Sequence, residues 1–325
     1  MDNDTTGLAA YDDEIDLREL FSVLWEGKLT IALVTALSAV ISVSVALNLP
    51  NKYTSEALLA PRAEGGAGGT LGQLASQYGG LASLAGINIG GLGEGGKTAI
   101  AIEMLKSREF FGEYLYDHVL VDLMATEGWD PASNKSIVDT SIYDSSSKIW
   151  VRDVGLAFQV KPSVQEAHKA FVESALSVSE DKQTGFVTLE ITHYSPSVAR
   201  DWVLLIVNGV NNAVRARDVE EAENSIAFLN EQRQKTSLVS LTEVFAELIE
   251  QQTKTVMLAA ASEEYVFQII DPPVAPELKS EPSRALICIL GVLLGGMLAV
   301  LYVLIRHYAK SDRQKSSSSG LVENR

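Results

Sequence analysis

The stretch from Gly91 to Thr98 has residue types and spacing that match a known chemical motif, since it reads GLGEGGKT. It fits the pattern G-x-x-x-x-G-K-[ST], in which glycine amides cradle phosphates, the lysine reaches the terminal phosphates and the hydroxyl binds Mg²⁺. The context argues against a nucleotide site. The motif lies in a tract, residues 65–96, that holds 13 glycines. No apolar strand ending in Asp follows to supply a second Mg²⁺ ligand, so we interpret the match as a coincidence of composition.

Other residues that could carry catalysis or bind a metal are scattered. His118, His168, His193 and His307 lack the spacing of metal ligands. There is no G-x-S-x-G nucleophile motif, and the only cysteine, Cys288, lies in an apolar run. The sequence therefore predicts no catalytic residue, no cofactor and no metal, and an enzyme is the weaker hypothesis.

Two apolar runs bracket most of the chain, residues 29–49 and residues 285–305. Each has 21 residues without Asp, Glu, Lys or Arg, which at about 1.5 Å per residue covers the roughly 30 Å of a bilayer's hydrocarbon core. We expect two membrane-spanning helices, with residues 50–284 on one side. The first run is longer than a signal-peptide core and no A-x-A-like site follows it, so we expect it to be retained.

Basic residues near the second run predict the orientation. Arg306, Lys310, Arg313 and Lys315 follow it, so the tail, residues 306–325, is predicted to be cytoplasmic. The tail at residues 1–28 then shares that side, and residues 50–284 are exported. In residues 12–28 the apolar positions recur at helical spacing, which predicts an interfacial helix leading into the first span, with Trp25 at head-group depth.

The exported region is acidic. Residues 50–284 contain 32 acidic and 19 basic residues, a formal charge of −13. Such a surface repels phosphate backbones, which argues against nucleic acid as a partner, and it disfavours ionic binding to an acidic polysaccharide. Neutral sugars are not excluded.

Periodicity predicts an α+β fold for this region, with a small mixed sheet near the membrane and long extended helices. The expected strands are residues 52–61, 149–160, 176–179, 186–192 and 266–270, and the expected helices are residues 97–124 and 163–174. Residues 127–147 are expected to be a polar connection. Ser163 is the expected N-cap of the second helix, with Glu166 completing a capping box.

A Ser-Pro pair at Ser195 and Pro196 predicts the start of a long helix. Up to residue 264 the sequence contains no further proline and a single glycine, so we expect two long helices over residues 196–264, separated by the polar patch at residues 232–237. The seam of the second helix is expected at Leu238, Leu241, Phe245 and Leu248. We expect it to pack against another helix, in the same chain or in a neighbouring copy.

Prolines and glycines mark the approach to the second span. Pro273, Pro276 and Pro282 lie in residues 271–282 and predict a stiff extended connector; the alternative is a plain solvent spacer. Within the span, Gly291 and Gly295 are four residues apart and Gly296 follows. This spacing allows close approach of another helix, which could be the first span, a neighbouring copy or another membrane protein.

In order along the chain, these elements resemble the Wzz-type chain-length determinants. The segments that carry the resemblance are DEIDLRELFSVLW at 13–25, YTSEALLAP at 53–61, LKSREFF at 105–111, the Ser-Pro helix start, DPPVAPELKSEP at 271–282 and the glycine-bearing second span. The family signature P-x2-P-x4-S-P is kept at its prolines, but Glu281 replaces the serine. The spacing from Pro282 to the glycines also differs from the usual one.

The resemblance implies a polysaccharide co-polymerase of the kinase-free class, because the short tail has no kinase and no tyrosine-rich segment. Such a protein lies in the bacterial inner membrane, with both termini cytoplasmic and the bulk periplasmic. It forms a homo-oligomeric ring and sets the length of a lipid-linked glycan, typically the O-antigen of lipopolysaccharide, that a separate polymerase makes. The alternatives are an exopolysaccharide or capsule export co-polymerase working with a separate kinase, and a two-span ligand-sensing receptor.

Overall fold

The computed structural model describes residues 17–62, 94–155, 158–236 and 238–319. The glycine tract therefore lies largely outside the described residues. The chain forms two compact units, one made of residues 1–49 with 282–325 and the other of residues 50–281. Each unit is described by itself.

The first unit contains three helices, α1 (Leu17–Glu26), α2 (Lys28–Asn48) and α10 (Arg284–Ser319). Residues Lys28–Asn48 and Arg284–Tyr308 are long and apolar enough to cross a membrane. Only Gly27 separates α1 from α2. The helix α10 continues past residue 305, where the sequence predicted the span to end, because no glycine or proline occurs between Met297 and Ser319 to interrupt it.

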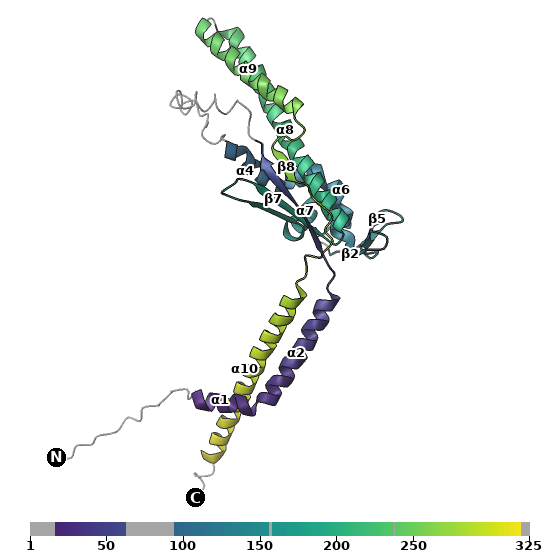
Figure 1. Cartoon of the computed structure of the whole chain (residues 1–325), viewed down its shortest axis with the longest axis vertical. Coiled ribbons are helices and arrows are strands. Elements are labelled where there is room, and N and C mark those ends of the chain that lie inside the picture. Colours follow the sequence, from purple (N-terminus) through teal and green to yellow (C-terminus); the bar gives the residue numbers. More distant parts are fainter. Residues whose placement is uncertain (1–16, 63–93, 156–157, 237, 320–325) are drawn as a thin grey trace, which may run out of the picture. The chain divides into compact units, whose positions relative to one another are not determined.

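The second unit is built on a four-stranded sheet. Its strands are β1 (Tyr53–Pro61), β6 (Leu176–Glu180), β7 (Val187–His193) and β8 (Phe267–Asp271), in the order β6-β7-β1-β8. All three pairings are antiparallel, so the expectation of a mixed sheet was wrong. The strands β7 and β8 run in the same direction but do not pair, since β1 lies between them (Figure 1).

The helices of this unit cover one face of the sheet. Alternate residues of β1 and β7 are fully buried, among them Ala57, Leu59, Leu189 and Ile191. They form one core with residues of the helices α4 (Glu94–Leu105), α6 (Tyr116–Ala125), α7 (Val164–Ser174) and α8 (Pro196–Lys235). This two-layer arrangement and the two apolar helices confirm the predicted α+β class.

The helix expected at residues 97–124 is broken. A separate turn, α5 (Arg108–Phe110), begins at Ser107, whose hydroxyl accepts a bond from the Phe110 amide at 3.1 Å. A π-helical turn, Phe111–Leu115, follows. Phe110 and Phe111, at the junction of the two turns, are both buried in the core. A π-helical turn usually occurs as a single turn of this kind within a longer helical segment.

The segment at residues 127–147, which was expected to be a polar connection, contains strands. A hairpin joins β2 (Thr126–Asp130) to β3 (Lys135–Val138), and a short one joins β4 (Tyr143–Asp144) to β5 (Ile149–Trp150). The strand predicted at residues 149–160 is limited to β5. Serine hydroxyls and backbone amides bind the carboxylates of Asp130 and Asp144 in the turns and lower the pKa of both.

The N-cap predicted for α7 is confirmed, since the Ser163 hydroxyl accepts a bond from the Glu166 amide. The capping box is wrong, because the carboxylate of Glu166 instead receives two guanidinium bonds from Arg152, one of them 2.7 Å long. These hydrogen bonds from Arg152, together with its positive charge, lower the pKa of Glu166. The salt bridge holds the chain after β5 against α7.

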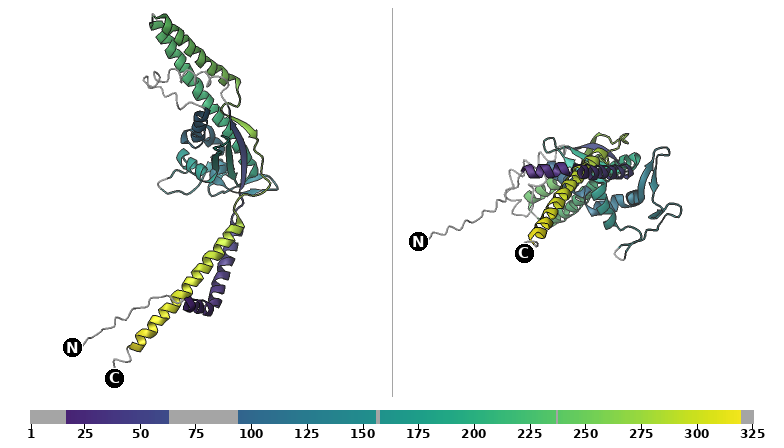
Figure 2. Two further views of the ribbon diagram at one scale, coloured as in Figure 1. Left: turned by 60° about the vertical axis from the view of Figure 1, so that its left-hand side comes forward. Right: turned by 90° about the horizontal axis from the view of Figure 1, so that it is seen from below.

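Two long helices form a hairpin in which α8 and α9 (Val239–Ala261) lie side by side (Figure 2). The Ser195 hydroxyl caps α8, as predicted. Within α8, the buried side chain of Asn211 accepts bonds from three consecutive amides, Tyr265 to Phe267, and donates to the Phe267 carbonyl at 3.0 Å. This side chain fixes the start of β8 to α8.

Candidate functional site

The lysine of the phosphate-binding pattern takes part in an ion pair within the fold. The Lys97 ammonium lies 2.9 Å from a carboxylate oxygen of Asp218 on α8, and the Tyr265 hydroxyl donates to the same oxygen at 2.8 Å. Thr98 is buried, with 4% of its surface exposed. The glycines at 91–93 lie outside the described residues. Lys97 thus joins α4 to α8 through an ion pair with Asp218.

The histidines are not gathered into a metal-binding group. In the described part of the chain, no three His, Cys, Asp or Glu side chains lie close enough to hold a metal ion. His193 is buried, and burial lowers its pKa. One ring nitrogen lies 3.1 Å from the Asp122 carbonyl and the other accepts from the Ser195 amide. These bonds make it a neutral packing residue at the start of α8.

The predicted glycines of α10 lie against α2. A side chain built on Gly291 would collide with the Ser42 side chain, and one built on Gly295 would collide with Ser38. At Gly296 the nearest atom would be the Thr35 hydroxyl at 3.8 Å, an ordinary contact. Gly291 and Gly295 therefore permit a close approach of the two helices that Gly296 does not need.

The partner face on α2 is also made of small residues. Ser38, Ser42 and Ala46 recur every fourth residue, and Ser42 and Ala46 are buried. The Ser38 hydroxyl donates to the Gly291 carbonyl at 2.6 Å. Sequence analysis missed this face, although its S-x3-S-x3-A spacing is a detectable signal. A bond of this kind, between a hydroxyl and a backbone carbonyl in an apolar pair, fixes the register of the helices.

Gly27 makes a second close contact in this unit. A Cβ there would lie 3.0 Å from one Val303 methyl group and closer still to the other. The Gly27 amide bonds to the Val23 carbonyl at 3.0 Å, and its own carbonyl accepts from the Ile31 amide. The turn from α1 into α2 is thus packed directly on α10.

The proline connector is bonded to the first strand. Pro273 is buried, whereas Pro276 is half-buried. The Ser55 hydroxyl donates to the Val274 carbonyl at 2.8 Å. Further along, the Ser280 amide donates to the Lys52 carbonyl at 2.9 Å. Within the second unit the connector therefore runs along β1 and is not a free spacer. Pro282 belongs to the other unit, where it is half-buried.

The helical hairpin exposes an apolar stripe on α9. Leu241, Val244 and Leu248 are exposed by 36% or more and follow the 3,4 spacing of a helical seam. Phe245 is less exposed. Of the seam residues predicted from sequence, Leu238, Leu241 and Leu248 are therefore exposed in the single chain. We call Leu241, Val244 and Leu248 the outer stripe.

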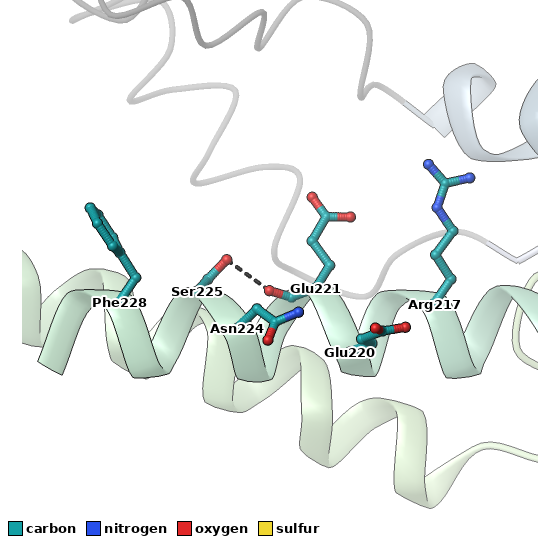
Figure 3. A pocket seen from close by; sticks show the side chains of 6 residues that line it. All are labelled: Arg217, Glu220, Glu221, Asn224, Ser225 and Phe228. Atoms are coloured by element: carbon teal, nitrogen blue, oxygen red, sulfur yellow. Dashed lines mark hydrogen bonds between the residues drawn. The ribbon is translucent and has the colours of Figure 1, made fainter. Parts of the chain in front are cut away.

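On α8, a row of mostly polar side chains lines one surface (Figure 3). Arg217, Glu221 and Phe228 project to the same side, and the Ser225 hydroxyl donates to the Glu221 carbonyl at 2.8 Å. The labelled side chains all come from one helix, so among the described residues they form a helix face without an opposing wall. This surface lacks the enclosure expected of a small-molecule site.

Two family models match the chain. Residues 13–118 match Wzz, the chain length determinant protein family. Residues 230–308 match GNVR, a G-rich domain described on tyrosine kinases. No curated protein is significantly similar to the chain in sequence.

The solved structures that match the chain include a full-length bacterial polysaccharide co-polymerase and a fragment of WzzB, a polysaccharide co-polymerase from Salmonella Typhimurium. The first is 14% identical, covers 92% of this chain and 99% of its own, and has a TM-score of 0.37. The second is 12% identical, covers 71% of this chain and 100% of its own, and has a TM-score of 0.30.

Proposed function

We propose that the chain is a Wzz-type chain length determinant, and that it regulates the length of a lipid-linked surface polysaccharide, of the O-antigen type, that a separate polymerase makes. The observation that carries the proposal is the Wzz match over residues 13–118. Two membrane-spanning candidates support it, since they anchor both ends of the intervening unit. The proposed location is the bacterial inner membrane, with the second unit in the periplasm and both termini in the cytoplasm.

The proposed mechanism is that of a scaffold. The Lys97–Asp218 ion pair uses the one lysine that could have bound a phosphate in the GLGEGGKT pattern. The bonds between the connector and β1 hold the end of the second unit that leads to α10. Glu281, which replaces the family serine, contributes its backbone amide to the Lys52 carbonyl at 3.2 Å. The connector thus needs no serine hydroxyl at that position.

We expect the scaffold to be a homo-oligomeric ring, and the outer stripe is the proposed contact between copies. Three apolar side chains on one face of a long helix are costly to leave in water, because each buried aliphatic side chain contributes about 1.5–3 kcal/mol. The seam spacing is that of helix-to-helix packing. A second copy of the same hairpin supplies an apolar helix of matching length.

The function is tested in cells that lack the gene. Their surface glycan, separated by gel electrophoresis, should lose its preferred length and still contain polymer, and the restored gene should return the preferred length. Complete loss of polymer would indicate a biosynthetic enzyme and refute the proposal.

Replacing Leu241 and Leu248 with Glu should reduce the oligomer to smaller species in detergent.

The second candidate is a co-polymerase for capsule or exopolysaccharide export that works with a separate kinase. The GNVR match over residues 230–308 favours it, since that domain is described on tyrosine kinases. A deletion strain separates the two functions. In the second case export of the polymer fails, whereas in the first its length changes.

A further inference from the structure

The sheet has an open face, opposite the helices. The residues that alternate with the core positions are half-buried or exposed, and most of them are polar: Thr54, Glu56, Leu58 and Ala60 on β1, and Thr188, Glu190 and Thr192 on β7. No described helix packs on this side, because the core contains only the other set of residues. The residues of this open face used below are Thr54, Glu56, Ser177, Thr188, Glu190 and Thr192. An antiparallel sheet tolerates one wet face, so polarity alone requires no ligand.

The unusual feature is a pair of opposed carboxylates. Glu56 of β1 is directly opposite Glu190 of β7, and Ser177 of β6 is opposite Glu190 on its other side. Like charges at opposed positions, about 5 Å apart at Cβ, destabilise a sheet. Neither carboxylate has a hydrogen-bond or ion-pair partner among the described residues. Features that break a local rule without compensation are typical of functional surfaces.

Hydroxyl groups flank Glu190 on both sides along β7, and Thr54 flanks Glu56 on one side along β1, with Leu58 on the other. The Thr54 and Thr192 hydroxyls, opposed in the next row, lie 2.9 Å apart, and Thr54 also lies 2.7 Å from the Ser280 hydroxyl. Thr188 lies on the other side of Glu190 along β7. Each hydroxyl can donate one bond and accept two, whereas an ionised carboxylate only accepts. The row therefore offers strong acceptors beside groups that both donate and accept.

We propose that the open face binds the saccharide chain of a lipid-linked glycan, with Glu56 and Glu190 accepting bonds from sugar hydroxyls. The carboxylates reject phosphates and acidic sugars and suit an uncharged ligand rich in donors. A basic protein segment would use the two carboxylates and leave the flanking hydroxyls with little to bind. The choice of a lipid-linked glycan rests on the proposed function, while the surface itself rests on the register of the strands.

The test uses the full chain in lipid nanodiscs. The probe is the polysaccharide released by mild acid from the surface glycolipid of the source cells, and its affinity is measured by affinity electrophoresis. The variants are Glu56→Gln, Glu190→Gln and the double change, with Glu173→Gln on the exposed side of α7 as the matched control. The double variant should bind roughly tenfold more weakly, as expected when bonds to charged acceptors become bonds to neutral ones. The control should bind like the original protein.

Thermal unfolding shows whether the variants fold. Each single variant should unfold at a higher temperature than the original protein, because the change removes a like-charge repulsion. Weaker binding together with higher stability is a result that damaged folding cannot produce. Binding unchanged in the double variant, or absent in the original protein, would overturn the proposal. The proposal would also be overturned if the protein bound a heptalysine peptide through these carboxylates but did not bind the polysaccharide. That result would indicate a basic protein partner.

Cells distinguish this proposal from the proposed function. If deletion of the gene changes the glycan length and the double variant fully restores it, the function stands and the open face is not its glycan site. If deletion changes nothing, the proposed function fails whatever the open face binds in vitro.

Discussion

Replacing Gly295 with Ala should separate α2 from α10. The added methyl group would overlap the Ser38 side chain, whose Cα would lie only 3.8 Å away. Ser38 cannot turn aside without cost, because its hydroxyl donates to the Gly291 carbonyl at 2.6 Å. We therefore expect the helices to move apart at this point and the hydroxyl bond to lengthen or break.

The neighbouring Gly296 provides a matched control. A methyl group at Gly296 would meet the Thr35 hydroxyl at 3.8 Å, which is ordinary contact. Both substitutions add the same atoms and the same gain in helix propensity, about 1 kcal/mol. That gain cancels in the comparison. The remaining difference is the overlap at Gly295, which we expect to make the Gly295→Ala variant less stable than Gly296→Ala by about 1–3 kcal/mol.

The assay follows the separation of the two helices in mixed micelles while the fraction of SDS is raised. Spin labels are attached at Leu47→Cys and Leu286→Cys, two exposed positions, one near the end of α2 and one near the start of α10. The only native cysteine, Cys288, is replaced by Ser. Gly295→Ala should lengthen the distance between the labels and separate the helices at a lower SDS fraction.

The close-packing interpretation would be refuted if the helices of the two alanine variants separated at the same SDS fraction. That result would mean that the glycines of α10 serve another surface. If Gly296→Ala lowered the stability of the helix pair more than Gly295→Ala did, the functional contact would lie on the side of α10 that faces away from Ser38.

Three further predictions concern the second unit. Asn211→Leu should lower the free energy of unfolding by about 2–4 kcal/mol, because buried amides and a carbonyl lose their partners. Asn211→Asp keeps the acceptor oxygen, so it should lower this free energy by less, as measured by urea denaturation. Glu166 has a lowered pKa in the folded state, so its pair with Arg152 stabilises the fold above the unfolded pKa of about 4.3, and that stability is lost as pH falls through the folded pKa. The difference in unfolding free energy between the original protein and Glu166→Gln should therefore shrink in acid; a constant difference from neutral to strongly acidic pH would contradict it. Lys97→Met should lower the unfolding temperature by leaving Asp218 without its cation. ATP should not change the unfolding temperature of the original protein. If ATP raised that temperature in the original protein but not in Lys97→Met, the motif would be a nucleotide site after all.

Sequence was sufficient for the features that depend on local periodicity. The two apolar runs, the strands β1, β7 and β8 and the start of α8 at Ser195 all follow from residue order along one element. The register of β1 with β7, which opposes Glu56 to Glu190, depends on residues more than a hundred positions apart. A single sequence carries no signal for such a pairing, so the open face could not be predicted.

The apolar seam of α9 is a second feature that the sequence alone predicts only in part. The sequence predicts one seam at Leu238, Leu241, Phe245 and Leu248, but the structure divides these residues. Phe245 is half-buried, whereas the other three are exposed. Spacing identifies apolar faces, whereas the choice between them depends on the helix that is actually adjacent.

The candidate glycines were predicted as a close-approach face with several possible partners. The structure places α2 against Gly291 and Gly295. The capping box at Glu166 failed for a different reason, because a distant guanidinium from Arg152 competes for the carboxylate. An ion pair with two hydrogen bonds outweighs one bond to a backbone amide.

The most direct test of the scaffold account measures polymer amount and polymer length in the same sample. Membrane vesicles from cells that lack the gene are supplied with radiolabelled sugar precursor, with and without the purified protein inserted. The account predicts equal total incorporation in both samples and a length distribution that narrows around a preferred value only when the protein is present. The account would be contradicted if total sugar incorporation depended on the protein, or if the length distribution were the same with and without it.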